Sequence, residues 1–587
     1  MIDLASQLSQ TAGAAFAALG LDAGLGAMWR SDRPDLADFQ CNGAMAAAKA
    51  AKTNPREIAQ GVVDELRRSL LVASAEVAGP GFINVRVSAE ALGERATAIF
   101  RDERAGAPSA EIPRRVVMDF GGWNVAKPMH IGHLRSTIIG DSLQRLFRFM
   151  GDEVTSDVHL GDWGLQMGQL INEVRLEQPE LSYFDADFSG PYPSVPPITM
   201  ETLERLYPQA SARSKTDADR RDLDRKATGE LQAGRSGYRA LWRHFCDVTR
   251  VGLERECAAL GVHFDMWKGE SDAESYIPEL VDDLKSRGIA VLDEGAWIVR
   301  IVREADRKEM PPLLLVNRDG AVGYHATDLG TIIDRKRTID PELTLYIVDQ
   351  RQALHFEQVF RAADMAGYAP ESALEHLGFG TMNGKDGKPF KTREGGVLKL
   401  HDLIAQARDA ASARLTEAGI GEGLSPEEFT DIASKVALAA IKFADLSNVR
   451  TTNYIFDLDR FISFEGKTGP YLLYAAVPMK SLTRRARAEG VEPGAISVEL
   501  DAERGLALAL DGFTETVRGA YARRMPHILC DHAFALAQAF SGFYAAAPIL
   551  AEKDVTRRAS RLALTLATMK QLELVLGLIG IETPERM

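Results

Sequence analysis

Two histidines separated by two residues are the most chemically suggestive feature of this sequence. His130 and His133 stand in Val116–Phe147, VVMDFGGWNVAKPMHIGHLRSTIIGDSLQRLF. On a helix, residues three apart lie on the same face, so both imidazoles point the same way. Donors fixed before a reaction begins are suited to stabilising charge on a reacting phosphate. Taken alone, such a pair is equally compatible with surface caps or metal ligands.

The flanking residues predict a strand, a glycine turn and a helix. The apolar run Val116–Phe120 predicts a strand, and Gly121 and Gly122 predict the turn. Apolar residues from Leu134 onward recur at spacings near 3.6, which predicts a helix whose first turn lies near Pro128. Free N–H groups and the positive dipole end at its N-terminus favour an anion. Gly132 would let a base or phosphate approach the backbone closely.

This segment resembles the HIGH signature of class I aminoacyl-tRNA synthetases. The longer string NVAKPMHIGHLRST is similar to its form in the arginyl-tRNA synthetase family. The resemblance implies that His130 and His133 are catalytic. It also implies an ATP site whose residues are Lys127, Pro128, His130, Gly132 and His133.

Acidic and hydroxyl side chains gather where later strands are predicted to end. They occur in the segments HLGDWGLQMGQL (159–170), LGVHFDMWKGESDAESY (260–276), PPLLLVNRDGAVGYHATDLGTIIDR (311–335) and LYIVDQRQALHFEQVF (345–360). NRDG is a hairpin-type turn. Ligands of open α/β sheets bind at loops that follow strands. The pattern favours a pocket for a cationic substrate.

In the resemblance, that substrate is arginine. A guanidinium presents five donors in a planar fork and is matched by carboxylate and phenol acceptors. The residues that the resemblance assigns to arginine are Asp119, Asn124, His133, Tyr324, Asp328 and Gln352. Trp123 departs from the family pattern, which usually has proline there, and its ring could reshape the pocket.

A glycine-rich basic loop follows in GKDGKPFKTREGG (384–396). Such a loop is ordinarily a solvated turn, but it could also clamp polyphosphate. In the resemblance it is the FKTR form of the KMSKS loop, which makes Lys388, Lys391 and Arg393 catalytic and places Lys391 on ATP. The register leaves open which of Lys388 and Lys391 contacts the phosphates, and Lys127 could compensate for a missing lysine.

Length and composition favour a multidomain globular protein. At 587 residues, about three or four domains are expected. No apolar run of about 18 residues suggests a membrane span, and the N-terminus lacks the basic start of a signal peptide, so the cytoplasm is expected. The four cysteines are scattered without metal-site spacing, and no metal site is predicted. The net charge of −14 argues weakly against nucleic acid, although a local basic face can coexist with it.

The N-terminal region, 1–108, mixes helical patterns with a predicted strand over Gly81–Val87. Its strings DFQCNGAMAAAK and AGPGFINVRV are similar to the N-terminal add-on domain of arginyl-tRNA synthetases. That resemblance implies tRNA contacts by Gln40, Asn42, Phe82 and Asn84. Each of these residues alone could equally be part of a turn or a core.

The remaining boundaries follow from composition and pattern. We expect a Rossmann-type α/β catalytic domain over 112–400, with a surface insertion near 182–240 whose charged run is a solvated helix face. A helical connection over 401–455 begins with a Ser/Glu capping signature. An all-helical domain over 456–587 resembles the family's anticodon-binding domain. Aromatic and basic groups there are suited to stacking on bases and holding phosphates, namely Tyr471, Tyr474, Lys480 and Arg484. Pro478 stands inside a helical pattern where a basic residue is expected, which predicts either a kink or the loss of an RNA contact.

The resemblance implies a monomeric ligase that activates L-arginine with ATP and Mg²⁺ and charges tRNA(Arg). Three alternatives stay open. One is a class I ligase for another amino acid, although acidic pocket residues disfavour an apolar one. Another is a small nucleotidyltransferase, which leaves the helical C-terminal region unexplained. The third is an inactive tRNA-binding paralogue.

Overall fold

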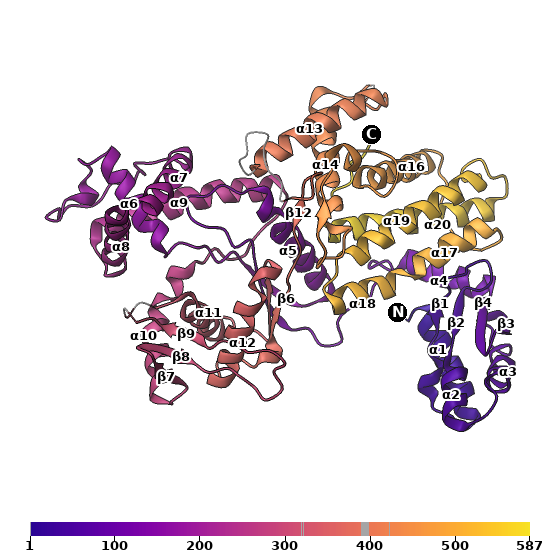
Figure 1. Cartoon of the computed structure of the whole chain (residues 1–587). Helices are drawn as coiled ribbons and strands as arrows, with labels where there is room; N and C mark the ends of the chain where they lie inside the picture. Colours follow the sequence, from indigo (N-terminus) through magenta and orange to yellow (C-terminus); the bar gives the residue numbers. More distant parts are fainter. Residues whose placement is uncertain (1, 319, 321, 389–397, 422) are drawn as a thin grey trace. The chain divides into compact units, whose positions relative to one another are not determined.

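The computed structural model of the chain describes residues 2–587 except 319, 321, 389–397 and 422 (Figure 1). Two compact units are present. The catalytic unit comprises Ala110–Ala410 and Ala444–Arg460. The terminal unit comprises Met1–Ser109, Ala411–Phe443 and Phe461–Met587.

A four-stranded parallel sheet forms the centre of the catalytic unit. Its strand order is β11 (Leu374–His376), β10 (Leu343–Ile347), β5 (Arg115–Phe120) and β6 (Glu153–Asp157). β5 lies in the middle and is buried from Val116 to Phe120, as expected for a parallel strand covered on both faces. The predicted Rossmann-type sheet is confirmed.

The strand order defines where a ligand should bind. From β5 the chain runs through α5 (Ile131–Met150) to β6 on one side, and it later places β10 on the other side of β5. Ligands of open α/β sheets bind at such a reversal, beyond the carboxyl ends of the strands. The residues that follow β5 and β10 therefore line the expected crevice.

The strand, glycine turn and helix predicted around the two histidines are confirmed, with one correction. Gly121 and Gly122 have φ values of 97° and 60°, which glycine adopts without strain. The helix α5 begins at Ile131 and has His130 as its N-cap residue. Pro128 therefore lies two residues before the cap rather than in the first turn.

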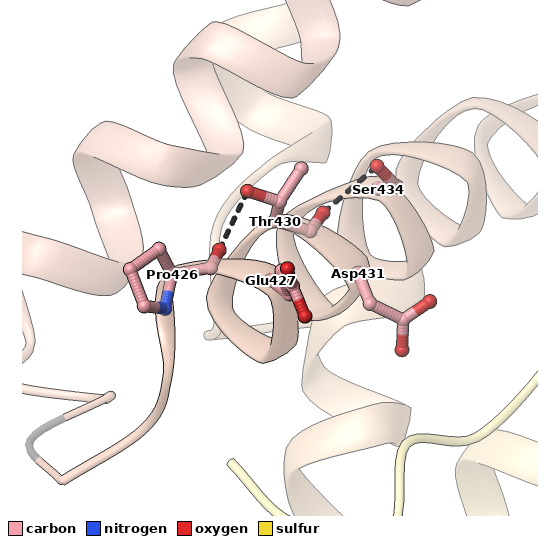
Figure 2. Close-up of a pocket in the computed structure, with 5 residues that line it drawn as sticks. All are labelled: Pro426, Glu427, Thr430, Asp431 and Ser434. Carbon is pink, nitrogen blue, oxygen red and sulfur yellow. Dashed lines mark hydrogen bonds between the residues drawn. The ribbon is translucent and has the colours of Figure 1, made fainter.

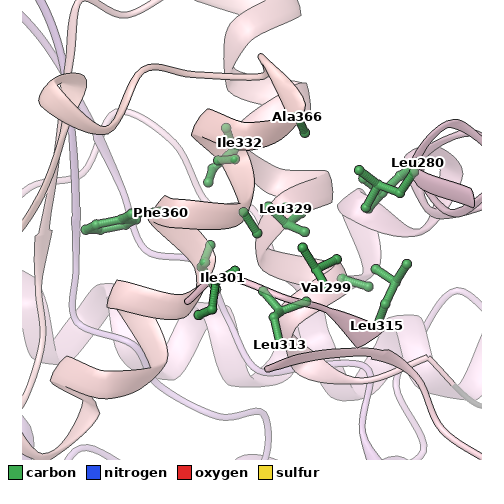
Figure 3. Close-up of a cluster of buried hydrophobic side chains, with 14 of the residues drawn as sticks. Leu280, Val299, Ile301, Leu313, Leu315, Leu329, Ile332, Phe360 and Ala366 are labelled. Carbon is green, nitrogen blue, oxygen red and sulfur yellow. The ribbon is translucent and has the colours of Figure 1, made fainter. Parts of the chain in front are cut away.

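A smaller antiparallel sheet and three helices make a second core in this unit. The sheet contains β7 (Ala290–Asp293), β8 (Ala296–Val299) and β9 (Leu313–Val316). Figure 3 shows Leu280 of α10 (Ile277–Ser286), Leu329 of α11 (Tyr324–Thr338) and Phe360 of α12 (Ala353–Ala366) in one apolar cluster with these strands. This packing fixes α11, the helix that carries Tyr324 and Asp328. The predicted NRDG turn precedes it, with Gly320 N–H donating to the Asn317 carbonyl.

The inserted region is helical, and its charged run is not simply solvated. Near 182–240 it contains α7 (Met200–Thr216), α8 (Ala218–Gln232) and the start of α9 (Ser236–Ala259), and it follows α6 (Leu165–Glu177). In α8, Arg220 is buried and pairs with Glu173 at 2.9 Å and with Asp224 at 2.8 Å. The expectation of a purely solvated face is wrong, because α8 packs one of its faces against α6.

The segments that join the units are also mainly helical. They comprise α13 (Leu400–Glu417), α14 (Pro426–Leu446), α15 (Leu458–Phe461) and the parallel pair β12 (Met382–Asn383) and β13 (Tyr454–Ile455). Ser425 and Glu428 form the predicted capping box at the start of α14, with backbone-to-side-chain bonds of 2.9 and 3.2 Å.

The terminal unit combines an α+β part with a helical bundle. The α+β part has an antiparallel sheet of order β1 (Trp29–Arg30), β2 (Phe39–Cys41), β4 (Phe82–Val87), β3 (Val72–Ala78), and the helices α1 (Leu4–Ala18), α2 (Gly43–Ala51), α3 (Pro55–Leu66) and α4 (Ala89–Arg101). The bundle contains α16 (Gly469–Ala488), α17 (Asp501–Asp511), α18 (Phe513–Arg523), α19 (His527–Ala546) and α20 (Val555–Leu578). The helix α16 continues through Pro478 to Ala488.

One buried carboxylate ties the two parts of the terminal unit together. Asp511 of α17 accepts hydrogen bonds from Arg95 at 2.7 Å, Arg30 at 3.0 Å and the Leu4 backbone at 3.2 Å. Across the described residues, none of the helices combines the length and apolar character needed to span a bilayer. All four cysteines carry free thiols.

Candidate active site

The two histidines at the start of α5 cap the helix and each other. The Nδ1 of His133 accepts the backbone N–H of His130 at 3.3 Å, and the Nδ1 of His130 accepts the N–H of Gly132 at 3.1 Å. The two rings stack with centroids 3.7 Å apart. Because each Nδ1 accepts a hydrogen bond, each neutral ring carries its own proton on Nε2. Two neighbouring N–H donors result.

Both rings are neutral near pH 7. Burial, with the charges of His130 and Lys127, lowers the pKa of His133 to about 3. Burial and Lys127 also lower the pKa of His130. The pair therefore acts through hydrogen-bond donation and not as imidazolium cations.

The expectation that this helix start offers free backbone N–H groups is wrong. The N–H of Ile131 donates to the Leu398 carbonyl at 3.0 Å, and that of His133 to the His130 carbonyl at 2.8 Å. A Cβ at position 132 would lie 2.9 Å from the His130 ring, so Gly132 makes room for that ring. The side-chain N–H groups stand where backbone donors were expected.

Neighbouring segments hold the loop before α5 in place. Thr249 and Glu256 of α9 accept the N–H groups of Ala126 and Met129, at 3.0 and 2.9 Å. The Leu400 N–H donates to the Met129 carbonyl at 3.0 Å. Residues that follow the predicted basic loop are thus bonded directly to the residues that precede His130.

The predicted phosphate-binding cations fall into two groups. The Lys127 Nζ lies 4.8 Å from the centre of the Tyr207 ring, which fixes its charge beside the histidines. Lys388 is exposed in a turn closed by a 2.8 Å bond from the Gly384 N–H to its carbonyl. Lys391 and Arg393 lie outside the described residues.

A buried guanidinium of the protein itself lies beneath the predicted arginine pocket. Asp157, Asp119 and Tyr346 stand side by side on β6, β5 and β10. The Arg335 Nη2, from α11, donates to Asp119 at 2.6 Å and to Asp157 at 2.8 Å, and its guanidinium lies 5.5 Å from the centre of the Tyr346 ring. Nε and Nη1 of Arg335 are buried and have no partner within the described part of the chain.

Two carboxylates that share one guanidinium differ in their pKa. Burial raises the pKa of Asp119 against the opposing effect of Arg335. At Asp157, burial is the largest single effect, but the charge of Arg335 and the hydrogen bonds from Arg335 and the Lys268 backbone contribute to a net lowering of the pKa. Asp119, predicted as an acceptor for substrate, therefore already has a guanidinium partner.

The other predicted arginine-binding residues lie at the starts of helices. Tyr324 is the first residue of α11 and is 67% exposed. Asp328, one turn later, accepts from the His355 Nε2 of α12 at 2.5 Å. Gln352 is exposed at the N-cap of α12. Asp328 and Arg335 are seven residues apart, which places Arg335 two turns further along the same face.

The loop after β6 carries further polar groups. Asn124 pairs with Gly161 of this loop, and Asp162 accepts from the backbone and hydroxyl of Ser271 at 2.9 and 2.6 Å. Burial raises the pKa of Glu270 to about 7, and the nearby charges of Asp162 and Asp328 act in the same direction. Glu270 also contributes to raising the pKa of Tyr324. The acidic groups of two loops and α11 therefore influence one another.

Trp123 is accommodated by aromatic packing. Its ring is fully buried and lies 5.5 Å from Phe264 and 5.9 Å from Trp267, centre to centre. The indole Nε1 has no hydrogen-bond partner among the described residues. An effect of Trp123 on the pocket stays a prediction.

Some residues of this site were not predicted as binding residues. Asp157 and Arg335 form the ion triad with Asp119, His355 pairs with Asp328, and Glu270 belongs to the acidic group. For Arg335 the available signal was its spacing of seven from Asp328 within a helical pattern. For Asp157 it was a position at the end of a predicted strand.

In the terminal unit, the predicted RNA-binding residues of the N-terminal part lie together. Gln40 of β2 and Asn84 of β4 are paired across the sheet, with the Gln40 amide donating to the Asn84 oxygen at 2.8 Å. Phe82 shares the partly exposed face with Asn84, because the residues between and beyond them are buried. Asn42 is exposed at the N-cap of α2.

The predicted residues of α16 have different surroundings. Tyr471 packs on Phe534 with ring centres 5.5 Å apart, whereas Tyr474 is 50% exposed. Arg484 donates to the Glu585 carbonyl at 2.9 Å. Lys480 is buried and pairs with Glu573 and Glu585, so the expectation that it is open to RNA is wrong. Tyr474 lines a hollow of about 530 Å³ together with Arg485, Tyr544 and Met587.

Another hollow lies on α14, and its hydroxyl groups are already hydrogen-bonded within the helix. Figure 2 shows Pro426, Glu427, Thr430, Asp431 and Ser434 around it. The Thr430 and Ser434 hydroxyls donate to backbone carbonyls of their own helix, at 2.8 and 2.9 Å. Those donors are therefore not directed at a ligand.

Three family models match the chain in order. The model described as Arginyl tRNA synthetase N terminal domain matches residues 4–87. The model of tRNA synthetases class I (R), catalytic domain, matches 96–458, and the DALR anticodon binding domain model matches 472–587. The catalytic model covers more than half of the chain.

Similar proteins match over the full length. The chain is 59% identical to an arginine–tRNA ligase of Maricaulis maris and 45% identical to one of Alkaliphilus oremlandii, covering 100% of both chains in each case. Its fold is similar to that of Thermus thermophilus arginyl-tRNA synthetase, with a TM-score of 0.80, 23% identity and 100% of both chains covered. The chain belongs to the arginyl-tRNA synthetase family.

Proposed function

We propose that this chain activates L-arginine with ATP and transfers the arginyl group to the 3′ end of tRNA(Arg), giving arginyl-tRNA, AMP and diphosphate. The observation that carries this proposal is the 59% identity, over the whole of both chains, to an arginine–tRNA ligase. The paired neutral imidazoles, in the same unit as a group of interacting acidic residues, support it.

In the first step, a carboxylate oxygen of arginine forms a bond to the α-phosphorus of ATP, and the bond to diphosphate breaks. Negative charge on the phosphate oxygens is stabilised by the Nε2–H donors of His130 and His133. Because these donors are already oriented by the helix cap, little reorganisation is needed. Lys127, Pro128 and Gly132 contact the nucleotide, and Lys388, Lys391 and Arg393 hold the leaving diphosphate.

The guanidinium of the substrate is held on the acidic side of the site. Asp328 and Tyr324 supply a carboxylate and a phenol from one face of α11, with Asp119 beneath them and Gln352 at the start of α12. Asn124 and His133 lie near the reacting carboxylate. A pocket that pairs every N–H of a guanidinium discriminates against amines by about 10⁴-fold or more, because a missing fork leaves buried acceptors unpaired.

In the second step, the terminal ribose hydroxyl of tRNA attacks the activated carbonyl, and AMP leaves. Gln40, Asn42, Phe82 and Asn84 contact the outer corner of the tRNA. Tyr471, Tyr474 and Arg484 contact its anticodon region through stacking and phosphate binding.

Magnesium enters with ATP. Within the described residues, no group of three or more His, Cys, Asp or Glu side chains is placed to hold a metal ion. The proposal therefore assigns Mg²⁺ to the phosphates of the substrate, where it usually keeps several waters. We further propose that the protein acts as a cytoplasmic monomer.

ATP–diphosphate exchange over a panel of amino acids tests this function. Arginine, lysine, ornithine and glutamine are compared with and without tRNA(Arg). We expect exchange with arginine alone, and its dependence on tRNA shows whether activation requires the bound RNA. Exchange with another amino acid would identify a ligase of different specificity, and tRNA binding without any exchange would identify an inactive paralogue.

A further inference from the structure

His159 is a histidine of the catalytic unit whose ring has no internal partner. Both ring nitrogens are buried, and neither has a hydrogen-bond partner among the described residues. Buried polar atoms in native proteins are nearly always hydrogen-bonded, so an unpaired pair requires an explanation. Either a water or a ligand must complete this ring.

The backbone at His159 is held in an unfavourable conformation. Its φ is 49°, in the left-handed region that few residues other than glycine adopt, asparagine, aspartate and histidine being the most frequent of them. The neighbours on both sides are fixed: the Val158 N–H donates to the Met266 carbonyl at 3.4 Å, the Leu160 N–H to the Lys268 carbonyl at 2.7 Å, and the Glu270 N–H to the Leu160 carbonyl at 2.9 Å. Such strain persists where the surrounding structure imposes it, and it clusters at ligand sites.

Acidic residues adjoin this loop. Asp157, two residues before His159, pairs with Arg335, the Leu160 carbonyl accepts from the Glu270 N–H, and Asp162 accepts from Ser271. The loop follows β6, next to the strand reversal where ligands of such sheets bind. A ligand that completes this site must therefore be a cation that donates N–H groups.

We propose that His159 is a specificity-determining residue, one of whose ring nitrogens accepts a hydrogen bond from the guanidinium of substrate arginine. This inference rests on the proposed function. The neutral imidazole has one donor and one acceptor nitrogen. The acceptor takes a guanidinium N–H, and the donor is left for a carboxylate of this region or a water, because neither ring nitrogen has a partner among the described residues. Arg335 already pairs with Asp119 and Asp157, so His159 adds an acceptor without a further carboxylate, where additional negative charge would be costly.

Substitutions at position 159 separate ring recognition from backbone strain. His159→Gly removes the ring and relieves the strained φ, so the protein should fold. His159→Asn keeps an acceptor oxygen and tolerates the left-handed conformation. The matched control is His376→Asn in β11, where the Nε2 already contacts the Val348 carbonyl at 3.2 Å.

The readouts are the KM values for arginine and ATP in ATP–diphosphate exchange with tRNA present, and the shift in melting temperature caused by arginine alone. For His159→Gly we expect the KM for arginine to rise about 10-fold or more, as for loss of a hydrogen bond to a charged group. The KM for ATP should stay unchanged, and the arginine-induced melting shift should shrink. His159→Asn should recover most of the affinity, and His376→Asn should match the unmodified protein.

Three results would overturn the inference. An unchanged KM for arginine in His159→Gly would mean that only a water completes the ring. An equal rise in both KM values would indicate a general structural effect. If the unmodified protein shows no arginine-dependent exchange, the proposed function fails and this inference fails with it. If the unmodified protein shows normal exchange and His159→Gly has the same KM for arginine, this inference alone is refuted.

Discussion

The candidate site has a phosphate side, formed by His130 and His133, and an arginine side, formed by Asp119, Asp157 and Arg335 with the acidic residues near them. The two sides differ in whether their polar groups have hydrogen-bond partners within the protein. At the start of α5, the Nδ1 atoms of His130 and His133 and the first backbone N–H groups are paired with one another. At the triad of Asp119, Asp157 and Arg335, charged groups are buried together, and two guanidinium nitrogens have no partner in the described residues.

This difference indicates which kind of ligand charge each side can stabilise. On the phosphate side, two neutral N–H donors are already oriented by hydrogen bonds within the protein, which suits negative charge that develops only during the reaction. The arginine side is charged and incomplete, which suits a ligand that brings its own charge and N–H donors. Breaking either arrangement should therefore affect different kinetic constants.

Removal of the buried guanidinium should have the largest effect. Arg335→Met leaves Asp119 and Asp157 buried beside each other without a cation, which costs about 3–5 kcal/mol of folding stability. We also expect the KM for arginine to rise, because Asp119 loses its anchor. Denaturant unfolding and exchange kinetics measure the two effects.

Two further variants keep this prediction testable if Arg335→Met folds poorly. The double variant Arg335→Met, Asp157→Asn removes one uncompensated charge and should recover stability. Arg361→Met is the matched control: Arg361 is also buried, but it pairs with Asp306, so it should lose stability without a change in the KM for arginine. Equal KM effects in both single variants would contradict a specific role for Arg335.

The donor pair should control turnover. His133→Ala removes one Nε2–H donor and one cap acceptor, and we expect the kcat of exchange to fall about 10²–10³-fold, as for loss of one oxyanion donor. The KM for arginine should rise by a smaller factor than kcat falls, because His133 is one of several groups proposed to contact the substrate. Because the pKa of His133 is about 3, the kcat profile of the unmodified protein should show no ionisation of this ring between pH 5 and 8. A rise in the KM for arginine without a loss of kcat would contradict the division between the two sides.

Glu270 should make arginine binding depend on pH. Its pKa of about 7 means that the carboxyl is largely protonated at pH 6 and ionised at pH 8. Because the ionised form attracts a cation, the KM for arginine should fall severalfold as the pH rises from 6 to 8, and Glu270→Gln should flatten that profile. Without substrate the sign is opposite: a raised folded-state pKa gives stability at low pH that is lost as the pH rises through 7. If Glu270→Gln showed the same pH dependence of the KM for arginine as the unmodified protein, Glu270 would not contribute to arginine binding.

Lys385 should have the smallest effect. It pairs with Asp457 at 3.0 Å, and the lysine side chain is 66% exposed. Exposed ion pairs contribute little to folding stability, so Lys385→Ala should barely change unfolding in urea. Turnover should stay close to that of the unmodified protein. A large loss of kcat would instead place Lys385 among the phosphate-binding groups and shift the assignment of the basic loop.

Elements with strong local signals could be predicted from the sequence. The apolar run of β5, the glycines after it and the helical spacing of α5 each follow from backbone preferences and burial. The capping box at Ser425 and Glu428 is equally local. The family resemblance also led to Tyr324 and Asp328, which lie one turn apart on one face of α11.

The buried ion pairs could not be predicted in the same way. Arg335 is 216 positions from Asp119, and only the parallel register of β5, β6 and β10 places Asp157 and Tyr346 beside that pair. The burial of Lys480 depends on acids more than 90 positions away. The expectation of free N–H groups at the start of α5 was wrong, because the two histidine side chains accept two of these N–H groups. The spacing of the histidines alone does not reveal that geometry.

The most direct test of the account compares arginine with citrulline in ATP–diphosphate exchange. Citrulline has nearly the same shape but carries an uncharged ureido group in place of the guanidinium. Because the arginine side is built from acidic groups that require a cation with N–H donors, kcat/KM should favour arginine by about 10⁴-fold or more. Comparable values for the two amino acids would contradict the account.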